Sequence, residues 1–212
     1  MARRDLKEAC VREALKIIES KGVEELSLRQ VARRLKVSHQ APYKHFPSKD
    51  HLLAEIIGRG FDTFAEYLQR EKTTRNPRRN LRLLGKAYLR FALDYSLYYR
   101  LMFASPHPDP KEHAEMARRS HGTFLILRGR VEAIAEATGA KMNIDMEALY
   151  IWSTMHGLAS ILAWEHTNGL PMKGDRRRQI NHVLNRIGDG LAAAVEAGLP
   201  RRPAPALTRQ RA

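Results

Sequence analysis

Residues 26–49 of this 212-residue chain read LSLRQVARRLKVSHQAPYKHFPSK, and this stretch decides the fold. Ser27 followed by Gln30 is the pattern of a capping box, so a helix is predicted to begin after Ser27. The apolar positions of that helix recur at helical spacing, at Leu28, Val31 and Leu35. Lys36-Val37 breaks the pattern, and Ser38 can cap a short third helix that ends before Pro47. Two short helices joined by a tight turn predict a helix-turn-helix.

The side chains that this helix-turn-helix would expose are suited to DNA. Ala32 is small enough for the two helices to pack closely. The side chains expected to face the core share one side of the third helix: Val37, Pro42 and Phe46. The first turn of a recognition helix usually reaches base edges in the major groove, so His39 and Gln40 are the predicted base readers. The predicted contact set also contains side chains suited to the phosphate backbone or the groove edge: Arg29, Ser38, Tyr43, Lys44, His45 and Lys49.

Helical periodicity continues along almost the whole chain, and no segment alternates as a half-buried strand does. A capping box at Asp5 and Glu8 predicts a first helix that ends at Gly22, and Ser48 is the predicted cap of a fourth helix. Further helices are predicted over residues 77–103, with a bend at Asp94-Tyr95, and over residues 111–138, 145–166 and 176–198. Residues 106–110 contain three prolines and are predicted to be a loop.

These patterns predict an all-α protein. A three-helix head with the helix-turn-helix is expected at residues 1–49, and a larger helical body at residues 50–199. Residues 200–212 are basic and proline-rich, which predicts a disordered tail.

The charge and the cysteine content narrow the class of protein. The chain carries 37 Lys and Arg against 23 Asp and Glu, a formal net charge of +14, which favours nucleic acid or an anionic membrane as the partner. Cys10 is the only cysteine, so no internal disulfide can form, and a redox role for Cys10 stays open. Neither a signal peptide nor an apolar run of about 18 residues is present. We therefore expect a cytoplasmic protein with no membrane partner.

Residues 26–53 closely resemble the DNA-binding domain of the TetR family of repressors. The strongest matches are Ala32, Val37, Ser38, Tyr43, His45-Phe46, Lys49 and Leu52-Leu53. The resemblance implies that Tyr43, His45 and Lys49 contact phosphates and that His39, Gln40 and Lys44 lie at the groove. The turn departs from the family at Lys36, where glycine is usual, and a left-handed backbone at this lysine would cost about 1 kcal/mol.

The resemblance also implies a body that dimerises and holds a pocket for a small-molecule effector. Residues 150–162, YIWSTMHGLASIL, are similar to the Trp-His-Gly stretch of one TetR C-terminal subclass. In this family the last two long helices form an intersubunit bundle, so the homodimer interface is expected at residues 145–166 and 176–198. The candidate pocket residues suit a mainly hydrophobic effector, although each can equally be an ordinary core residue: Tyr98, Met102, Phe103, Phe124, Trp152 and His156.

The expected function is that of a TetR-like repressor which a small-molecule effector releases from palindromic double-stranded operator DNA. An enzyme is not expected, because no phosphate loop, nucleophile motif or metal-ligand spacing occurs, and no cofactor is implied. His113 and His121 are eight residues apart, and Glu165-His166 has no partner at ligand spacing, so no metal site is predicted. Two alternatives stay open: a membrane-surface protein with a basic segment at residues 75–90, and a DNA-binding activator or nucleoid component.

Overall fold

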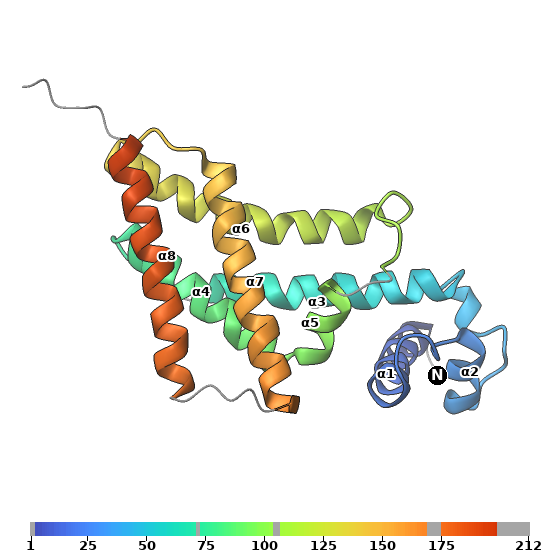
Figure 1. Ribbon diagram of the computed structural model, residues 1–212. Helices are drawn as coiled ribbons and strands as arrows, with labels where there is room; N and C mark the ends of the chain where they lie inside the picture. Colours follow the sequence, from blue (N-terminus) through green and yellow to red (C-terminus); the bar gives the residue numbers. More distant parts are fainter. Residues whose placement is uncertain (1–2, 71–72, 104–106, 169–174, 199–212) are drawn as a thin grey trace, which may run out of the picture.

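The computed structural model describes residues 3–70, 73–103, 107–168 and 175–198. Within these ranges the protein has eight α-helices, one 3₁₀ turn and no strand (Figure 1), so the predicted all-α class is confirmed. In chain order the elements are α1 (Arg3–Lys21), α2 (Leu28–Leu35), η1 (Pro42–Lys44), α3 (Lys49–Arg70), α4 (Pro77–Asp94), α5 (Ser96–Phe103), α6 (Ala114–Thr138), α7 (Ile144–Asn168) and α8 (Arg176–Gly198). The predicted tail at residues 200–212 lies outside the described residues.

Local sequence signals set most of the helix boundaries. Helix α2 begins as predicted, because the Gln30 amide donates to the Ser27 hydroxyl oxygen at 3.2 Å. The second half of that capping box is not formed, since the Gln30 side-chain oxygen is buried without a hydrogen-bond partner among the described residues. The predicted cap of α3 is also confirmed, because the His51 amide donates to the Ser48 hydroxyl oxygen at 3.3 Å.

The prediction for the start of the first helix is wrong. Helix α1 already includes Arg3, so Asp5 lies inside the first turn and does not precede it. The Glu8 carboxylate is held by the Arg59 guanidinium, with both oxygen–nitrogen distances at 2.7 Å. Glu8 therefore joins α1 to α3 instead of completing a capping box. The end of α1 is as predicted, at Gly22 with a φ of 90°.

The predicted third helix is a turn over residues 39–41 followed by the single 3₁₀ turn η1. Proline has no amide hydrogen, so Pro42 cannot donate to the Ser38 carbonyl as an α-helix would require. The Ala41 amide donates to that carbonyl instead, at 3.0 Å, and the His45 amide donates to the Pro42 carbonyl at 2.9 Å. Both bonds span three residues, which is the 3₁₀ pattern.

The bend predicted at Asp94-Tyr95 is a break between two helices. Tyr95 has φ −121° and ψ 47°, which is not helical, although its amide still donates to the Phe91 carbonyl at 2.8 Å. The Tyr99 amide then donates to the Tyr95 carbonyl at 2.9 Å. Tyr95 thus ends α4 and α5 starts in a new direction.

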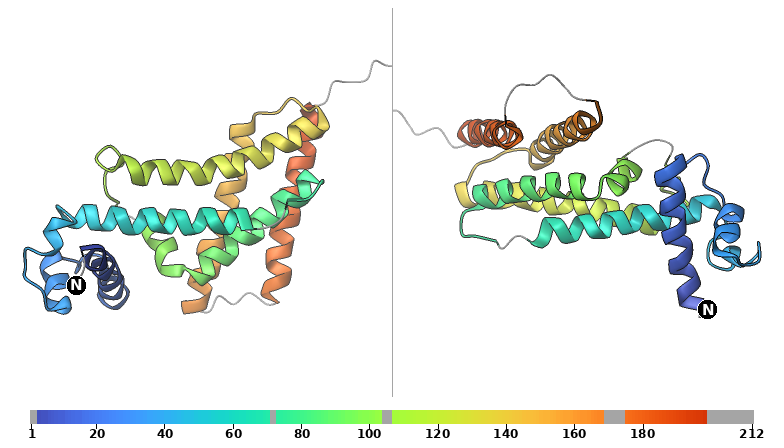
Figure 2. Two further views of the ribbon diagram at one scale, coloured as in Figure 1. Left: turned by 180° about the vertical axis from the view of Figure 1, so that it is seen from behind. Right: turned by 90° about the horizontal axis from the view of Figure 1, so that it is seen from below.

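Helix α3 connects the head to the body. The head consists of α1, α2, η1 and the first turns of α3, packed around buried Ile17, Val31 and Phe46. The rest of α3 packs against α4, α5 and α6. Helices α7 and α8 form a second layer over this first one (Figure 2). The described helices include none long and apolar enough to cross a membrane.

Candidate nucleic-acid interface and ligand cavity

The segment between α2 and α3 has an exposed face on a buried support. Pro42 and Phe46 are buried, with Phe46 only 2% exposed, and they anchor η1 to the head core. His39, Gln40 and Lys44 are exposed, and Tyr43 is 42% exposed although it is aromatic. The structure therefore presents the predicted base readers and two of the predicted phosphate contacts on one exposed segment.

This part of the head is strongly basic. Residues 26–49 contain six Lys and Arg and no Asp or Glu: Arg29, Arg33, Arg34, Lys36, Lys44 and Lys49. Arg34 is neutralised by Glu13 at 2.9 Å. Arg29, Lys36 and Lys44 are exposed and form no salt bridge within the described residues. A compact surface with unpaired cations and no carboxylate attracts a polyanion.

The turn after α2 is left-handed at Lys36, the position where the TetR family usually has glycine. Lys36 has φ 55° and ψ 40°, and it is the residue with positive φ among the described non-glycine residues. The Val37 amide donates to the Ala32 carbonyl at 3.1 Å, which closes the end of α2. This closure turns the chain so that η1 crosses the end of α2.

Two predicted contact residues, His45 and Lys49, are less exposed than the others. The Lys49 ammonium group donates to the Glu24 carbonyl at 3.1 Å, and Lys49 is half-buried at the start of α3. His45 is half-buried as well, and it lines a cavity of about 220 Å³ where the head meets the body. Its neighbours in that cavity include His51 and His113, whose rings are 4.8 Å apart.

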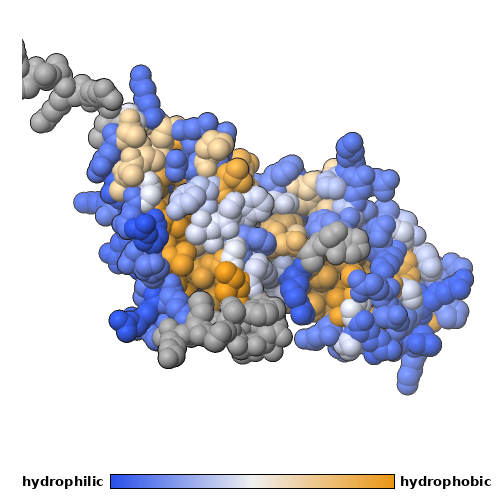
Figure 3. All heavy atoms as spheres, viewed as in Figure 1, coloured by the Kyte–Doolittle hydropathy of each residue, from blue (hydrophilic) through white to orange (hydrophobic). Residues whose placement is uncertain are grey.

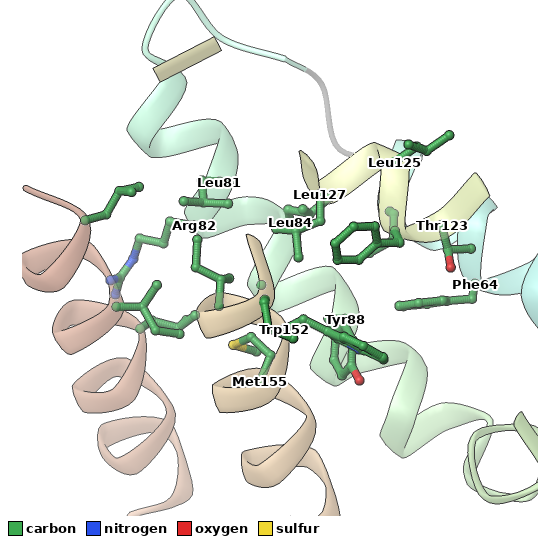
Figure 4. A pocket seen from close by; sticks show the side chains of 18 of the residues that line it. Phe64, Leu81, Arg82, Leu84, Tyr88, Thr123, Leu125, Leu127, Trp152 and Met155 are labelled. Atoms are coloured by element: carbon green, nitrogen blue, oxygen red, sulfur yellow. The ribbon is translucent and has the colours of Figure 1, made fainter. Parts of the chain in front are cut away.

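The main feature of the body is a cavity of about 610 Å³. It lies between α3, α4, α6, α7 and α8, with Phe103 at the end of α5, and Figure 4 shows 18 of the side chains that line it. Its walls are mostly aliphatic and aromatic. The described lining residues include Phe61, Phe64, Leu68, Leu81, Leu84, Tyr88, Phe103, Thr123, Phe124, Leu127, Trp152, Met155, Leu184, Ile187 and Leu191, with Arg78 and Arg82 among them.

Three of the six predicted pocket residues line this cavity: Phe103, Phe124 and Trp152. Tyr98 and Met102 do not, because both pack against α3 at Gly60. A Cβ atom at Gly60 would lie 2.8 Å from the Met102 sulfur and 3.0 Å from a Tyr98 ring carbon. These two side chains therefore fill the seam between α3 and α5.

His156 lies behind the cavity wall. Its Nδ1 is 2.7 Å from the Tyr99 hydroxyl oxygen, and its ring centroid is 5.0 Å from that of Phe103 and 6.4 Å from that of Trp152. Burial lowers the pKa of His156 below its ordinary value, so the ring is neutral at pH 7. His156 thus supports two lining residues without reaching the cavity.

Sequence reasoning missed most of the lining residues of α4 and α8. Leu81, Leu84 and Tyr88 recur at helical spacing along α4, and cavity walls and solid cores use the same apolar residues at the same spacing. One local signal of a cavity was present in the sequence, because a charged residue interrupts the apolar residues of α4: Arg82 lies between Leu81 and Leu84, and Gly85 follows.

Apolar side chains are also exposed on the layer of α7 and α8 (Figure 3). Met146, Leu149, Tyr150 and Ile161 of α7 are between 44% and 59% exposed. The buried apolar residues of α8 pack within this subunit: Leu184, Ile187, Leu191 and Val195. The unpartnered apolar surface therefore belongs mainly to α7.

Other candidate chemistry finds no support in the described part of the chain. Within it, no three His, Cys, Asp or Glu side chains gather as a metal site, and the side chains of Glu165 and His166 lie outside the described residues. Cys10 is fully buried, and burial raises the pKa of its thiol, which disfavours the reactive thiolate.

A basic helix-turn-helix head on a helical body defines a DNA-binding transcriptional regulator. Residues 11–56 match the family model described as bacterial regulatory proteins, tetR family. Residues 81–187 match the model described as tetracyclin repressor-like, C-terminal domain. The chain belongs to the TetR family of bacterial regulators.

Solved structures match the fold over most of its length. A protein of unknown function from Rhodococcus sp. RHA1 is 26% identical with a TM-score of 0.69, over 90% of this chain and 95% of that one. A putative tetR family transcription regulator from Shewanella sp. PV-4 is 20% identical with a TM-score of 0.66, over 95% and 100%. The fatty acid degradation regulator FadR from Bacillus halodurans is 12% identical with a TM-score of 0.64, over 87% and 93%. No curated protein sequence matches this chain.

Proposed function

We propose that this TetR-family regulator is a homodimeric repressor that a small hydrophobic effector releases from a palindromic operator. The observation that carries the proposal is the path of α3. This single helix begins at Lys49, beside the exposed basic segment, and carries Phe61, Phe64 and Leu68 into the cavity wall. A ligand that displaces this wall would shift α3 and with it the head.

The proposed docking places the segment between α2 and α3 at the major groove. His39 and Gln40 reach base edges, while Tyr43, Lys44 and the Arg29 side chain of α2 bind phosphates. Ser38 lies at the same exposed edge. His45 and Lys49 complete the phosphate set once the Lys49 ammonium group exchanges the Glu24 carbonyl for a phosphate oxygen. A flexible lysine can make that exchange at little cost.

The proposed dimer interface is centred on the exposed apolar face of α7, with α8 beside it. A Cβ atom at Gly157 on α7 would have no atom within 4 Å among the described residues, so a partner helix has room to approach. This arrangement also fits the Trp-His-Gly subclass, in which Trp152 and His156 would shape the pocket and Gly157 the interface. A two-fold dimer places two heads on successive half-sites.

The test begins with a search for the operator. Fragments of the promoter upstream of the protein's own gene are titrated with the full-length protein, and the bound region is mapped by footprinting. We expect one palindromic footprint above a salt-sensitive background. Transcription in vitro from that promoter should then fall when the protein is added. A uniform footprint, or transcription that rises, would contradict the repressor proposal.

The dimer is tested separately by sedimentation equilibrium. Replacing Met146 and Ile161 together by glutamate should convert the dimer into a monomer, because it places charges in a desolvated interface. Leu125→Glu, which changes an equally exposed leucine on α6, is the matched control and should remain dimeric. A double variant that stays dimeric would place the interface elsewhere.

A further inference from the structure

We propose that the effector is an amphipathic anion, an aliphatic carboxylate, whose tail fills the cavity and whose carboxylate binds Arg82 and Arg78. This inference rests on the proposed function of the cavity and adds to it the chemical class of the ligand. The observation that carries it is the distribution of charge and hydrogen bonds between the two ends of the cavity.

One end of the cavity is mainly apolar, and the Tyr88 and Thr123 hydroxyls there already have hydrogen-bond partners. Phe64, Trp152 and Tyr88 lie there, as Figure 4 shows. The Tyr88 hydroxyl is 3.4 Å from the Tyr99 hydroxyl, and the Thr123 hydroxyl donates to the Ser120 carbonyl at 2.7 Å. These two hydroxyls already share their hydrogen bonds with the protein, so this end favours the apolar part of a ligand.

The other end carries Arg82, which reaches from α4 toward α8 (Figure 4). Its two terminal nitrogens donate to the side-chain oxygens of Asn185 at 2.5 Å and Asn181 at 2.9 Å. Both partners are neutral amides, so they fix the direction of the guanidinium without cancelling its charge. A guanidinium has five N–H donors, and within the described residues only these two hydrogen bonds of Arg82 are formed.

Two other half-buried arginines that lie between helices are neutralised by carboxylates. Arg59 pairs with Glu8 and Glu55, and Arg119 pairs with Asp62 and Glu115. Arg82 has no carboxylate partner among the described residues. A positioned but uncompensated guanidinium at the edge of an apolar cavity is the arrangement that an anionic head group would complete.

A second cation reinforces this end. Arg78 precedes Arg82 by one helical turn, lines the same cavity, and also forms no salt bridge within the described residues. Residues four apart on a helix lie on the same face. Two cations at one end and aromatic rings at the other fix both the sign of the ligand's charge and its direction in the cavity.

The test compares ligands that share a tail and differ in the head. Full-length protein without DNA is titrated by calorimetry with dodecanoate, 1-dodecanol and dodecylammonium, each below its micelle concentration. We expect dodecanoate to bind at least tenfold more tightly than the alcohol, and the ammonium compound to bind most weakly. Equal binding of the acid and the alcohol, or a preference for the cation, would overturn the proposal.

Variants locate the head group. In the Arg78→Gln, Arg82→Gln double variant the preference for dodecanoate over dodecanol should disappear while the alcohol binds as before. Arg79→Gln is the matched control, since Arg79 is exposed on the same helix and does not line the cavity. A preference that survives the double variant would show that another group binds the carboxylate.

A cavity-filling variant separates the cavity from the basic surface. Leu84→Trp should abolish dodecanoate binding, with its thermal unfolding transition checked for a native fold. If a folded Leu84→Trp protein still binds, the acid sits on the surface and the proposal fails; the arginine variants keep the test independent of this one. If dodecanoate binds as expected but does not release operator DNA, the ligand class stands and the proposed effector mechanism fails.

Discussion

The Tyr99 hydroxyl oxygen lies 2.7 Å from Nδ1 of His156 and joins α5 to α7 behind the ligand cavity. His156 is neutral, because burial lowers its pKa, and Nδ1 of the neutral ring forms a hydrogen bond with the Tyr99 hydroxyl. The His156 ring in turn packs against Phe103 and Trp152, which line the cavity. This hydrogen bond thus holds part of the cavity wall in place.

Removing the Tyr99 hydroxyl should destabilise the protein. Tyr99→Phe leaves Nδ1 of His156 without its nearest hydrogen-bond partner, and we expect a loss of about 1–2 kcal/mol in the free energy of unfolding. Urea denaturation measures the loss. Tyr98→Phe is the control, because Tyr98 is half-buried on the same helix and no hydrogen bond of its hydroxyl is described. An equal loss in both variants would contradict the role given to the Tyr99–His156 bond.

The lowered pKa of His156 predicts a pH dependence of stability. The unfolded chain binds a proton at His156 near pH 6.5 and the folded protein binds it only at lower pH, so protonation favours unfolding. The contribution of neutral His156 is present above about pH 6.5 and is lost as the pH falls below that value. Wild-type protein should therefore lose more stability between pH 7.5 and pH 5.5 than His156→Gln does. His182→Gln, an exposed histidine on α8, should behave as the wild type.

Lys44 and Gln40 should affect operator binding in different ways. Lys44→Ala removes one phosphate contact and should lower the slope of log affinity against log salt by about 0.9, with similar losses on all sequences. Gln40→Ala should keep the salt slope and weaken discrimination at one base pair by about 1–3 kcal/mol. Fluorescence anisotropy over a salt series measures both effects. Lys86→Ala on the body is the control, and a change there as large as that of Lys44→Ala would refute the docking.

Lys36→Gly should stabilise the head. Lys36 holds a φ of 55°, which glycine adopts without a clash with Cβ, and the expected gain is up to about 1 kcal/mol because glycine also makes the unfolded chain more flexible. Arg33→Gly, inside α2, should instead lose about 1 kcal/mol. Thermal or urea unfolding distinguishes the two. A loss of stability in Lys36→Gly would mean that the lysine side chain makes a contact worth more than the backbone strain.

The sequence by itself determined the helical class, most helix ends and the basic exposed segment of the head. These features depend on neighbouring residues: Ser27 and Ser48 satisfy amides three residues away, and Lys36 closes α2 through its own backbone. The resemblance to the TetR family, over residues 26–53, rests on the same short stretch of sequence. At η1 the missing amide of Pro42 removes one α-helical hydrogen bond, and the chain forms 3₁₀ bonds there.

Only the tertiary structure decided which apolar residues enclose a cavity and which fill the core. Met102 and Leu84 both occupy apolar positions of helices, yet Met102 fills the seam at Gly60 while Leu84 borders the cavity. Tertiary packing likewise buried Leu184, Ile187, Leu191 and Val195 of α8 against the other helices of the same subunit. It also placed the Arg82 guanidinium beside Asn181 and Asn185. Periodicity gives the face of a helix that is buried. A cavity, by contrast, is the space left between six separate helices that do not pack tightly together, and no single segment encodes that space.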